Sequence, residues 1–121
     1  MDAAYSLSVV DGILQVVFRG VQDFQTTENA IAEGAKILGE KKIRRVLFDF
    51  EAAQANGYFT ETVRHAERAQ KLGLSRNLRL AFYGPHIRDT VEFMATVAAN
   101  RGYTAHAFGD RDEALRWLKQ G

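Results

Sequence analysis

The chain has 121 residues, a length that fits one compact domain. Hydrophobic residues make up 46% of it and charged residues 26%, as in ordinary globular proteins, so a disordered or fibrous chain is excluded. The 16 basic and 15 acidic side chains give a net charge of +1, and we therefore expect no binding to nucleic acid. Cysteine is absent, which excludes disulfides, thiolate catalysis and cysteine-based metal sites.

The sequence shows no targeting segment. No apolar run approaches the ~20 residues that a membrane-spanning helix needs. Residues 1–5 include Asp2 and lack the basic and apolar regions of a secretory signal. These observations predict a cytoplasmic protein with no stable membrane anchor.

The chain opens with a predicted β-hairpin. Apolar and polar residues alternate over 5–9 and again over 14–19, which is the pattern of strands with one buried face. Between the two segments lies Asp11-Gly12, a dipeptide that tolerates the positive φ angles of a tight hairpin turn.

A helix and a buried strand are predicted next. Thr26 or Thr27 is the expected N-cap of the helix, and Gly39 is its expected end. The apolar run 46–50 has the length and composition of a parallel strand buried on both faces. Apolar residues recur at helical spacing within the helix: Ile31, Ala35 and Leu38.

The second helix is predicted to run from the N-cap Thr60 to residue 72, with Gly73 as its stop. Residues 78–83 form the next predicted strand, and the helix after it ends at Gly102. A modest apolar stripe marks the second helix: Val63, Ala66 and Ala69 or Gln70.

The last predicted strand covers 103–108. Asp110 and Glu113 have the spacing of a capping box, so a final helix is expected to begin after Asp110. The element order ββαβαβαβα predicts an α/β fold in a single domain, 1–121. Its sheet is expected to be mixed, with about five strands, an N-terminal hairpin and packed helices.

Ligands of open α/β sheets bind outside the carboxyl ends of the strands. This rule selects the loops 51–59, 84–86 and 109–110, of which the first is the longest. It contains Asn56-Gly57 just before Thr60, where N–H groups at a helix start can hold an anion. The alternative is that Asn-Gly only makes a turn and that Thr60 only caps its helix.

Charged residues at these loops are candidates for acid–base or metal-binding groups. Asp49 and Glu51 share one face at a strand end and resemble a carboxylate pair for Mg²⁺ or acid–base chemistry. The alternative is a carboxylate that accepts hydrogen bonds from local N–H groups. His86 and Arg88 form a slightly cationic corner that suits a phosphate or simply faces solvent.

The three histidines do not form a metal-binding pattern. Glu61 and His65 have i, i+4 spacing on one helix, which an ordinary surface pair explains as well as a shared metal. The basic cluster 41–45 precedes a buried strand and is expected to be solvated. We therefore expect no metal and no cofactor.

The end of the chain carries a family resemblance. A short strand reaches Phe108, an acidic turn follows at Asp110, and Glu113-Ala114 leads to Trp117-Leu118. This ending resembles that of bacterial STAS-like domains similar to stage II sporulation protein AA, which are also compared with the lipid-binding CRAL-TRIO fold. The resemblance extends over essentially the whole chain through further positions: Gly12, Arg19-Gly20 and the strand end 47–49.

The resemblance implies a four- to five-stranded sheet with helices, used for regulated protein–protein contact. Anti-sigma-factor antagonists of this family carry a phosphorylated serine at the start of the helix after the third strand. The corresponding loop 51–62 of this chain contains no serine, and Thr60 is the nearest hydroxyl in that place. Added phosphate would be best accommodated at Thr60, at a helix N-terminus.

Three functions follow from these observations. The leading hypothesis is a non-enzymatic STAS-like module that binds a protein partner, is modulated by phosphorylation and forms a homodimer. The second is a carrier for an apolar, lipid-like or anionic small molecule at the strand-end loops. The third is an enzyme with Asp49 and His86 as acid and base. The residues expected to bind or regulate are Asp49, Gly57, Tyr58, Thr60, Tyr83, Gly84, His86 and Arg88.

Overall fold

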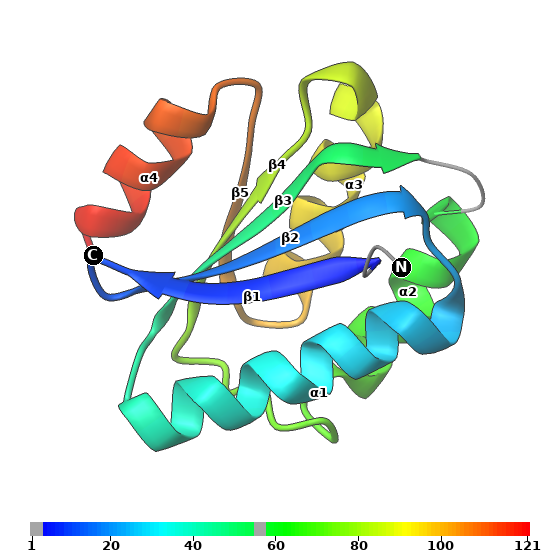
Figure 1. The fold of residues 1–121 in the computed structure, drawn as a ribbon. Helices are drawn as coiled ribbons and strands as arrows, with labels where there is room; N and C mark the ends of the chain where they lie inside the picture. Colours follow the sequence, from blue (N-terminus) through cyan, green and yellow to red (C-terminus); the bar gives the residue numbers. More distant parts are fainter. Residues whose placement is uncertain (1–3, 55–57) are drawn as a thin grey trace.

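The computed structural model describes the backbone of residues 4–54 and 58–121, and the side chains of these residues except 58–60. Within them lie five strands, four α-helices and a 3-10 turn, in the predicted order ββαβαβαβα (Figure 1). The elements are β1 (Tyr5–Val10), β2 (Ile13–Val21), α1 (Phe24–Lys41), β3 (Arg45–Gln54), α2 (Tyr58–Ala69), β4 (Arg79–Tyr83), η1 (Pro85–Ile87), α3 (Arg88–Asn100), β5 (Thr104–Phe108) and α4 (Arg111–Lys119).

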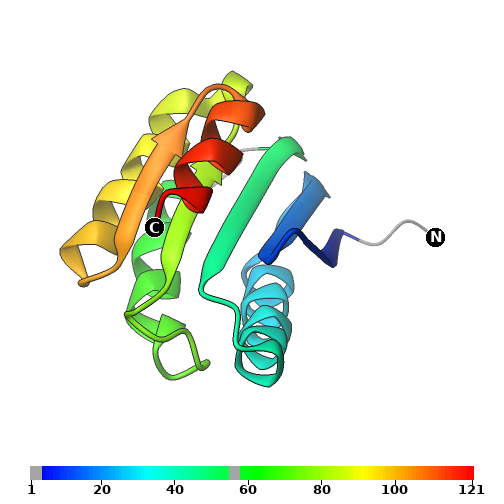
Figure 2. The same cartoon turned by 90° about the vertical axis from the view of Figure 1, so that its left-hand side faces the viewer.

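The strands form one mixed sheet in the order β1-β2-β3-β4-β5, which Figure 2 shows from the orange edge to the blue one. β1 and β2 are antiparallel, and the pairs from β2 to β5 are parallel. The predicted hairpin turn is confirmed, because Asp11 and Gly12 have φ angles of 53° and 74°. The predicted α/β fold with its N-terminal hairpin is therefore confirmed.

The helices divide unequally between the two faces of the sheet. Right-handed crossovers between parallel strands that follow one another in space place every crossover helix on the same face. Accordingly, α1, α2 and α3 contribute to one hydrophobic cluster, whereas α4 covers a smaller cluster on the opposite face (Figure 1). The large cluster is the main core of the protein.

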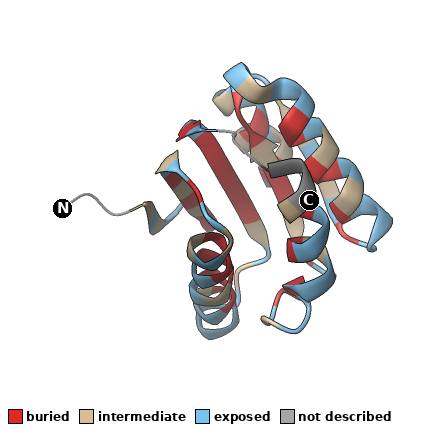
Figure 3. Cartoon of the chain, turned by 90° about the vertical axis from the view of Figure 1, so that its right-hand side faces the viewer, coloured by how far each residue is buried: buried red, intermediate tan, exposed pale blue. Residues whose placement is uncertain are grey.

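Strand alternation separates the two clusters. On β3, Val46, Phe48 and Phe50 face the α1–α3 side, whereas Leu47 faces α4. The strand has covered faces on both sides and is buried over most of its length (Figure 3). The prediction of a buried central strand at 46–50 is thus confirmed.

The predicted ends of the first helix are wrong. The helix begins after Asp23, whose Oδ1 accepts a hydrogen bond from the Thr26 N–H at 2.7 Å, so neither Thr26 nor Thr27 is the N-cap. It also continues through Gly39 to Lys41. Lys42 then adopts a left-handed conformation, and the Ile43 N–H donates to the Leu38 carbonyl, which satisfies the helix end without glycine.

The predicted long loop 51–59 is also wrong. β3 continues to Gln54 because β2 reaches Val21 and offers backbone partners to residues 52–54. α2 begins at Tyr58, which places Thr60 in the first helical turn and not at the N-cap. The connection between β3 and α2 is therefore shorter than the sequence suggested.

Candidate functional site

Two of the predicted site residues, Asp49 and Tyr83, lie next to each other near the carboxyl end of the sheet. They are direct neighbours in the parallel pairing of β3 and β4. Both are buried and face α4: Tyr83 belongs to the cluster under that helix, and Asp49 is paired with its first residue, Arg111. The structure therefore brings this part of the predicted site together.

Asp49 is the centre of a hydrogen-bonded network that joins three elements. Its Oδ1 accepts from the Glu51 N–H at 3.0 Å, and its Oδ2 accepts from Arg111 Nε at 3.0 Å. Arg111 also donates to the side-chain oxygen of Gln15 on β2. Both carboxylate oxygens are thus engaged: the Glu51 N–H is a local donor, as in the alternative above, whereas Arg111 is 62 positions away in the sequence.

Tyr83 shares its surroundings with carboxylates. Burial raises the pKa of Tyr83, and the neighbouring Glu51 raises it further, with smaller contributions from Asp49 and Asp110. All of these effects favour the neutral phenol. The hydroxyl of Tyr83 is therefore a hydrogen-bonding group and not a source of negative charge at neutral pH.

The turn after β4 holds Gly84, His86 and Arg88. A Cβ at Gly84 would lie 2.9 Å from Ile87 Cγ1, so a side chain there would force its neighbours to shift. His86 donates from Nε2 to the Ala53 carbonyl at 2.8 Å, and the exposed Arg88 pairs loosely with its helix neighbour Glu92. The His86 contact fastens the turn to β3, the Arg88 pair lies within α3, and neither contact links His86 to Asp49.

The remaining predicted residues cannot be placed in the site. Gly57 lies outside the described residues, and so do the side chains of Tyr58 and Thr60. A role for them in binding or phosphorylation stays a prediction.

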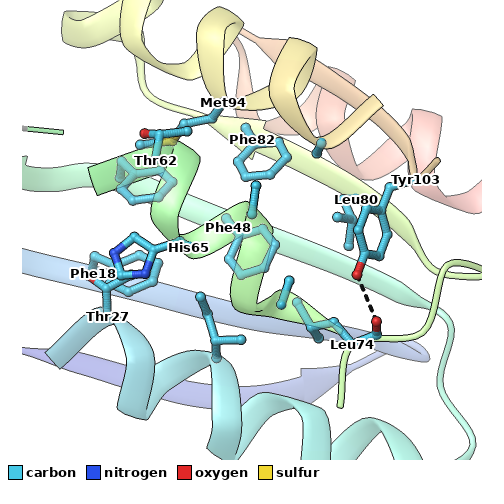
Figure 4. A pocket seen from close by; sticks show the side chains of 15 residues that line it. Phe18, Thr27, Phe48, Thr62, His65, Leu74, Leu80, Phe82, Met94 and Tyr103 are labelled. Carbon is cyan, nitrogen blue, oxygen red and sulfur yellow. Dashed lines mark hydrogen bonds between the residues drawn. The ribbon is translucent and has the colours of Figure 1, made fainter. Parts of the chain in front are cut away.

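The described residues line a cavity of about 90 Å³ on the opposite face of the sheet, between the strands and the helices (Figure 4). The sheet side is formed by aromatic and aliphatic side chains: Phe18, Phe48, Phe50, Leu80 and Phe82. Helices α1 and α3 contribute Thr27, Ile31, Met94 and Ala98, and Leu74 and Tyr103 close one end. The Tyr103 hydroxyl donates to the Leu74 carbonyl at 2.7 Å. The walls are therefore almost entirely apolar.

The composition of α2 explains why this space is open. Its side toward the core carries Thr62, His65, Ala66 and Ala69, none of which is a large aliphatic residue. Val63, which the sequence assigned to the apolar stripe, is exposed. Without a large aliphatic residue on this side, the described part of α2 leaves space above the five aromatic or aliphatic strand residues.

His65 is buried at the contact between α2 and α1. Its Nδ1 lies 2.7 Å from Oε2 of Glu28, and its ring stacks on that of Phe24 with 4.6 Å between the ring centroids. Arg68, one turn later on α2, donates to the other oxygen of Glu28. Glu61 has no part in this cluster, since it pairs with Arg64 at the surface.

Glu28 is a buried carboxylate held in its ionised form. Burial by itself raises its pKa, but the hydrogen bonds from Arg68 and His65 outweigh burial, so that the pKa of Glu28 lies below its usual range. Because an ionised carboxylate only accepts hydrogen bonds, His65 carries a proton on Nδ1.

Two polar atoms among the cavity-lining residues have no hydrogen-bond partner in the part of the chain that the structure describes. They are Nε2 of His65 and Oγ1 of Thr27, and each of the two residues as a whole is more than nine-tenths buried. A buried polar atom without a partner costs roughly 1–3 kcal/mol. Both residues line the cavity, but neither atom is exposed on its surface, so a ligand atom reaches them only when the wall moves.

The sequence carries a signal for this site on the buried faces of α1 and α2. The predictions above make Thr27 an N-cap, pair His65 with Glu61 and give Glu28 no role. Yet Thr27 and Glu28 lie three or four residues before Ile31, on the buried stripe of α1. Polar residues on the buried faces of two helices are the pattern that could have indicated a partly polar cavity.

The described residues also bear on metal binding and on membrane insertion. They hold no group of three or more His, Asp or Glu side chains arranged to bind a metal ion. None of their helices is both long enough and apolar enough to cross a membrane.

No protein-family model matches the chain, and no curated protein matches it either. The resemblance to STAS-like domains therefore stays a prediction.

Proposed function

We propose that this protein binds a small, largely apolar molecule in the cavity between the sheet and α2. The observation that supports this proposal is the pairing of apolar walls with two buried, unpartnered polar atoms, His65 Nε2 and Thr27 Oγ1. Ligand sites in proteins are commonly apolar pockets with a few polar groups that fix the orientation of the ligand. The sequence-based hypothesis of a small-molecule carrier is kept, with its site moved from the strand-end loops to this cavity.

The size of the cavity limits the size of the ligand. Its volume of about 90 Å³ is smaller than the ~150 Å³ of an engineered cavity that binds benzene or xenon. A ligand of about one six-membered ring is therefore the size that we expect the cavity to hold, and it requires some movement of the wall. Met94 lines the cavity and has the flexible, unbranched side chain that adapts most easily to such movement.

The proposal can be tested through Met94, since the sequence contains only Met1 and Met94. Protein labelled with ¹³C at the methionine methyl groups should give two methyl signals, one of which reports on the cavity. Titration with benzene should shift the Met94 signal to saturation, because a bound aromatic ring lies against it, and should leave the Met1 signal in place. No shift of Met94 up to the solubility limit of benzene would contradict the proposal.

A control variant distinguishes the cavity from the protein surface. Ala69 of α2 lines the cavity and is 6% exposed, so Ala69→Leu should occupy the space and abolish the shift. Ala99 of α3 is exposed, and Ala99→Leu adds the same atoms without entering the cavity. Loss of the benzene shift in both variants would indicate a general effect of the added side chain.

The other sequence-based functions are unaffected by this proposal. Binding of a protein partner, homodimer formation and phosphorylation at Thr60 stay predictions, because no described contact bears on them. An acid–base role for Asp49 with His86 has no support in their hydrogen bonds, which lead to Arg111 and to Ala53.

A further inference from the structure

We infer that the ligand carries a hydroxyl group, as a small phenol does, and that His65 and Thr27 recognise this group. The inference rests on the proposed function and names the chemical class of its ligand. It follows from the proton on His65, from the position of Thr27 on α1 and from the charges around the cavity.

The position of the proton makes Nε2 of His65 a hydrogen-bond acceptor. Glu28 accepts from Nδ1 at 2.7 Å, so in the neutral ring the lone pair is on Nε2. Phe24 stacks on the ring and Glu28 binds its other edge, which together fix the orientation of the ring. A ligand atom that meets Nε2 of the neutral ring is therefore a donor.

Thr27 belongs to the same region of the α1–α2 contact. The ring of His65 touches Phe24 and Glu28, which lie one turn apart on α1. Thr27 lies between them in sequence, three residues after Phe24, and faces the same side of the helix. A hydroxyl both donates and accepts, so one ligand hydroxyl can donate to His65 and accept from Thr27.

Charge argues against a ligand carboxylate. Glu28 already places a buried negative charge at the His65 ring, and Arg68, its cationic partner, is half exposed and does not line the cavity. The described lining residues include no lysine or arginine. A second anion would thus be buried without a cation of its own, which is costly, whereas a neutral hydroxyl avoids this cost.

Aromatic walls favour a ring over an aliphatic chain. Phe48 stacks on Phe18 at 6.5 Å and on Phe82 at 5.1 Å between ring centroids, and all three line the cavity. Contacts between aromatic rings contribute more favourable free energy than the buried area of the rings alone would give. A ring with one hydroxyl matches these walls and the two polar atoms together.

Phenol and benzene are the matched probes for the test, which again uses the ¹³C methyl signal of Met94. In an apolar cavity without polar partners, phenol should bind about tenfold more weakly than benzene because its hydroxyl loses hydrogen bonds to water. With His65 and Thr27 as partners, we expect phenol to bind at least as tightly as benzene. Thr27→Val should then weaken the binding of phenol about fivefold and change the affinity for benzene less than about twofold.

Glu28 is a positioning residue, because it holds the proton of His65 on Nδ1, and NMR spectroscopy can observe where that proton lies. The ¹⁵N shifts of the His65 ring should show a proton on Nδ1, while His86, which donates from Nε2, provides the opposite tautomer in the same spectrum. In Glu28→Gln, the single amide oxygen should stay with Arg68 and the NH₂ group should face Nδ1. The proton of His65 should then move to Nε2, and the preference for phenol should fall at least about threefold.

Glu67→Gln is the matched control, since Glu67 lies on the exposed side of α2 and pairs with Arg101 at 3.4 Å. It should leave the His65 tautomer and both affinities unchanged. If benzene binds and phenol binds about tenfold more weakly in the wild type, the hydroxyl inference is wrong and the proposed function stands. If neither binds, both are wrong. If Glu28→Gln does not fold, the tautomer of His65 in the wild type and the comparison of phenol with benzene still decide whether the hydroxyl inference is right.

Discussion

Filling the cavity should stabilise the protein while it removes binding. Ala69→Leu adds three carbon atoms to the side of α2 that faces the cavity. At ~24 cal/mol per Å³ of cavity, the volume of about 90 Å³ costs the native state about 2 kcal/mol. Leucine loses up to about 1 kcal/mol of rotamer entropy on burial and has nearly the helix propensity of alanine. The net gain should therefore be about 1 kcal/mol.

Urea unfolding measures this gain directly. The midpoint of Ala69→Leu should rise at an unchanged m-value, and its Tm should rise by about 4 °C for a chain of this size. Ala99→Leu, on the exposed side of α3, should change stability by less than about 0.5 kcal/mol. A loss of 1 kcal/mol or more in Ala69→Leu, as in an overpacked core, would refute the reasoning that usable space exists beside α2.

Three further predictions test the polar groups. Thr27→Val should raise the free energy of unfolding without ligand by about 1 kcal/mol, since it removes a buried unpartnered hydroxyl; a loss in urea unfolding would show that the hydroxyl has a partner. The folded pKa of Glu28 lies below its unfolded value, so its contribution to stability is full above pH ~4.5 and is lost as pH falls through the folded pKa. Urea midpoints should thus fall with acidification more steeply in the wild type than in Glu28→Gln, and parallel curves would contradict this. Asp49→Ala should cost about 2 kcal/mol through loss of the Arg111 contact, yet leave benzene binding unchanged because Asp49 faces α4; impaired binding would link the two faces.

The fold was predictable where the signals are local. The Asp11-Gly12 turn and the Asp110 cap each depend on a few adjacent residues, and both are found as expected. Which face of the sheet each helix covers depends on the order of the strands in the sheet, and no local sequence pattern specifies that order. They become explicable once the strands are seen to follow one another in space, because each right-handed crossover then falls on the same side.

The candidate site was less predictable because it is made by distant segments. His65 and Glu28 are 37 positions apart, and their contact depends on how α1 and α2 pack. The extension of β3 to Gln54 likewise depends on the length of β2, its neighbour in the sheet. Both features arise from tertiary pairing, which local propensity does not encode.

A crystal structure of the protein grown with phenol tests the central claim most directly. The account predicts density for one ring between Phe48, Phe82 and Met94, the residues that line the cavity on the sheet and on α3. The phenol oxygen should lie within about 3.2 Å of His65 Nε2. An unoccupied cavity at saturating phenol, or a ring bound only elsewhere on the surface, would contradict the account.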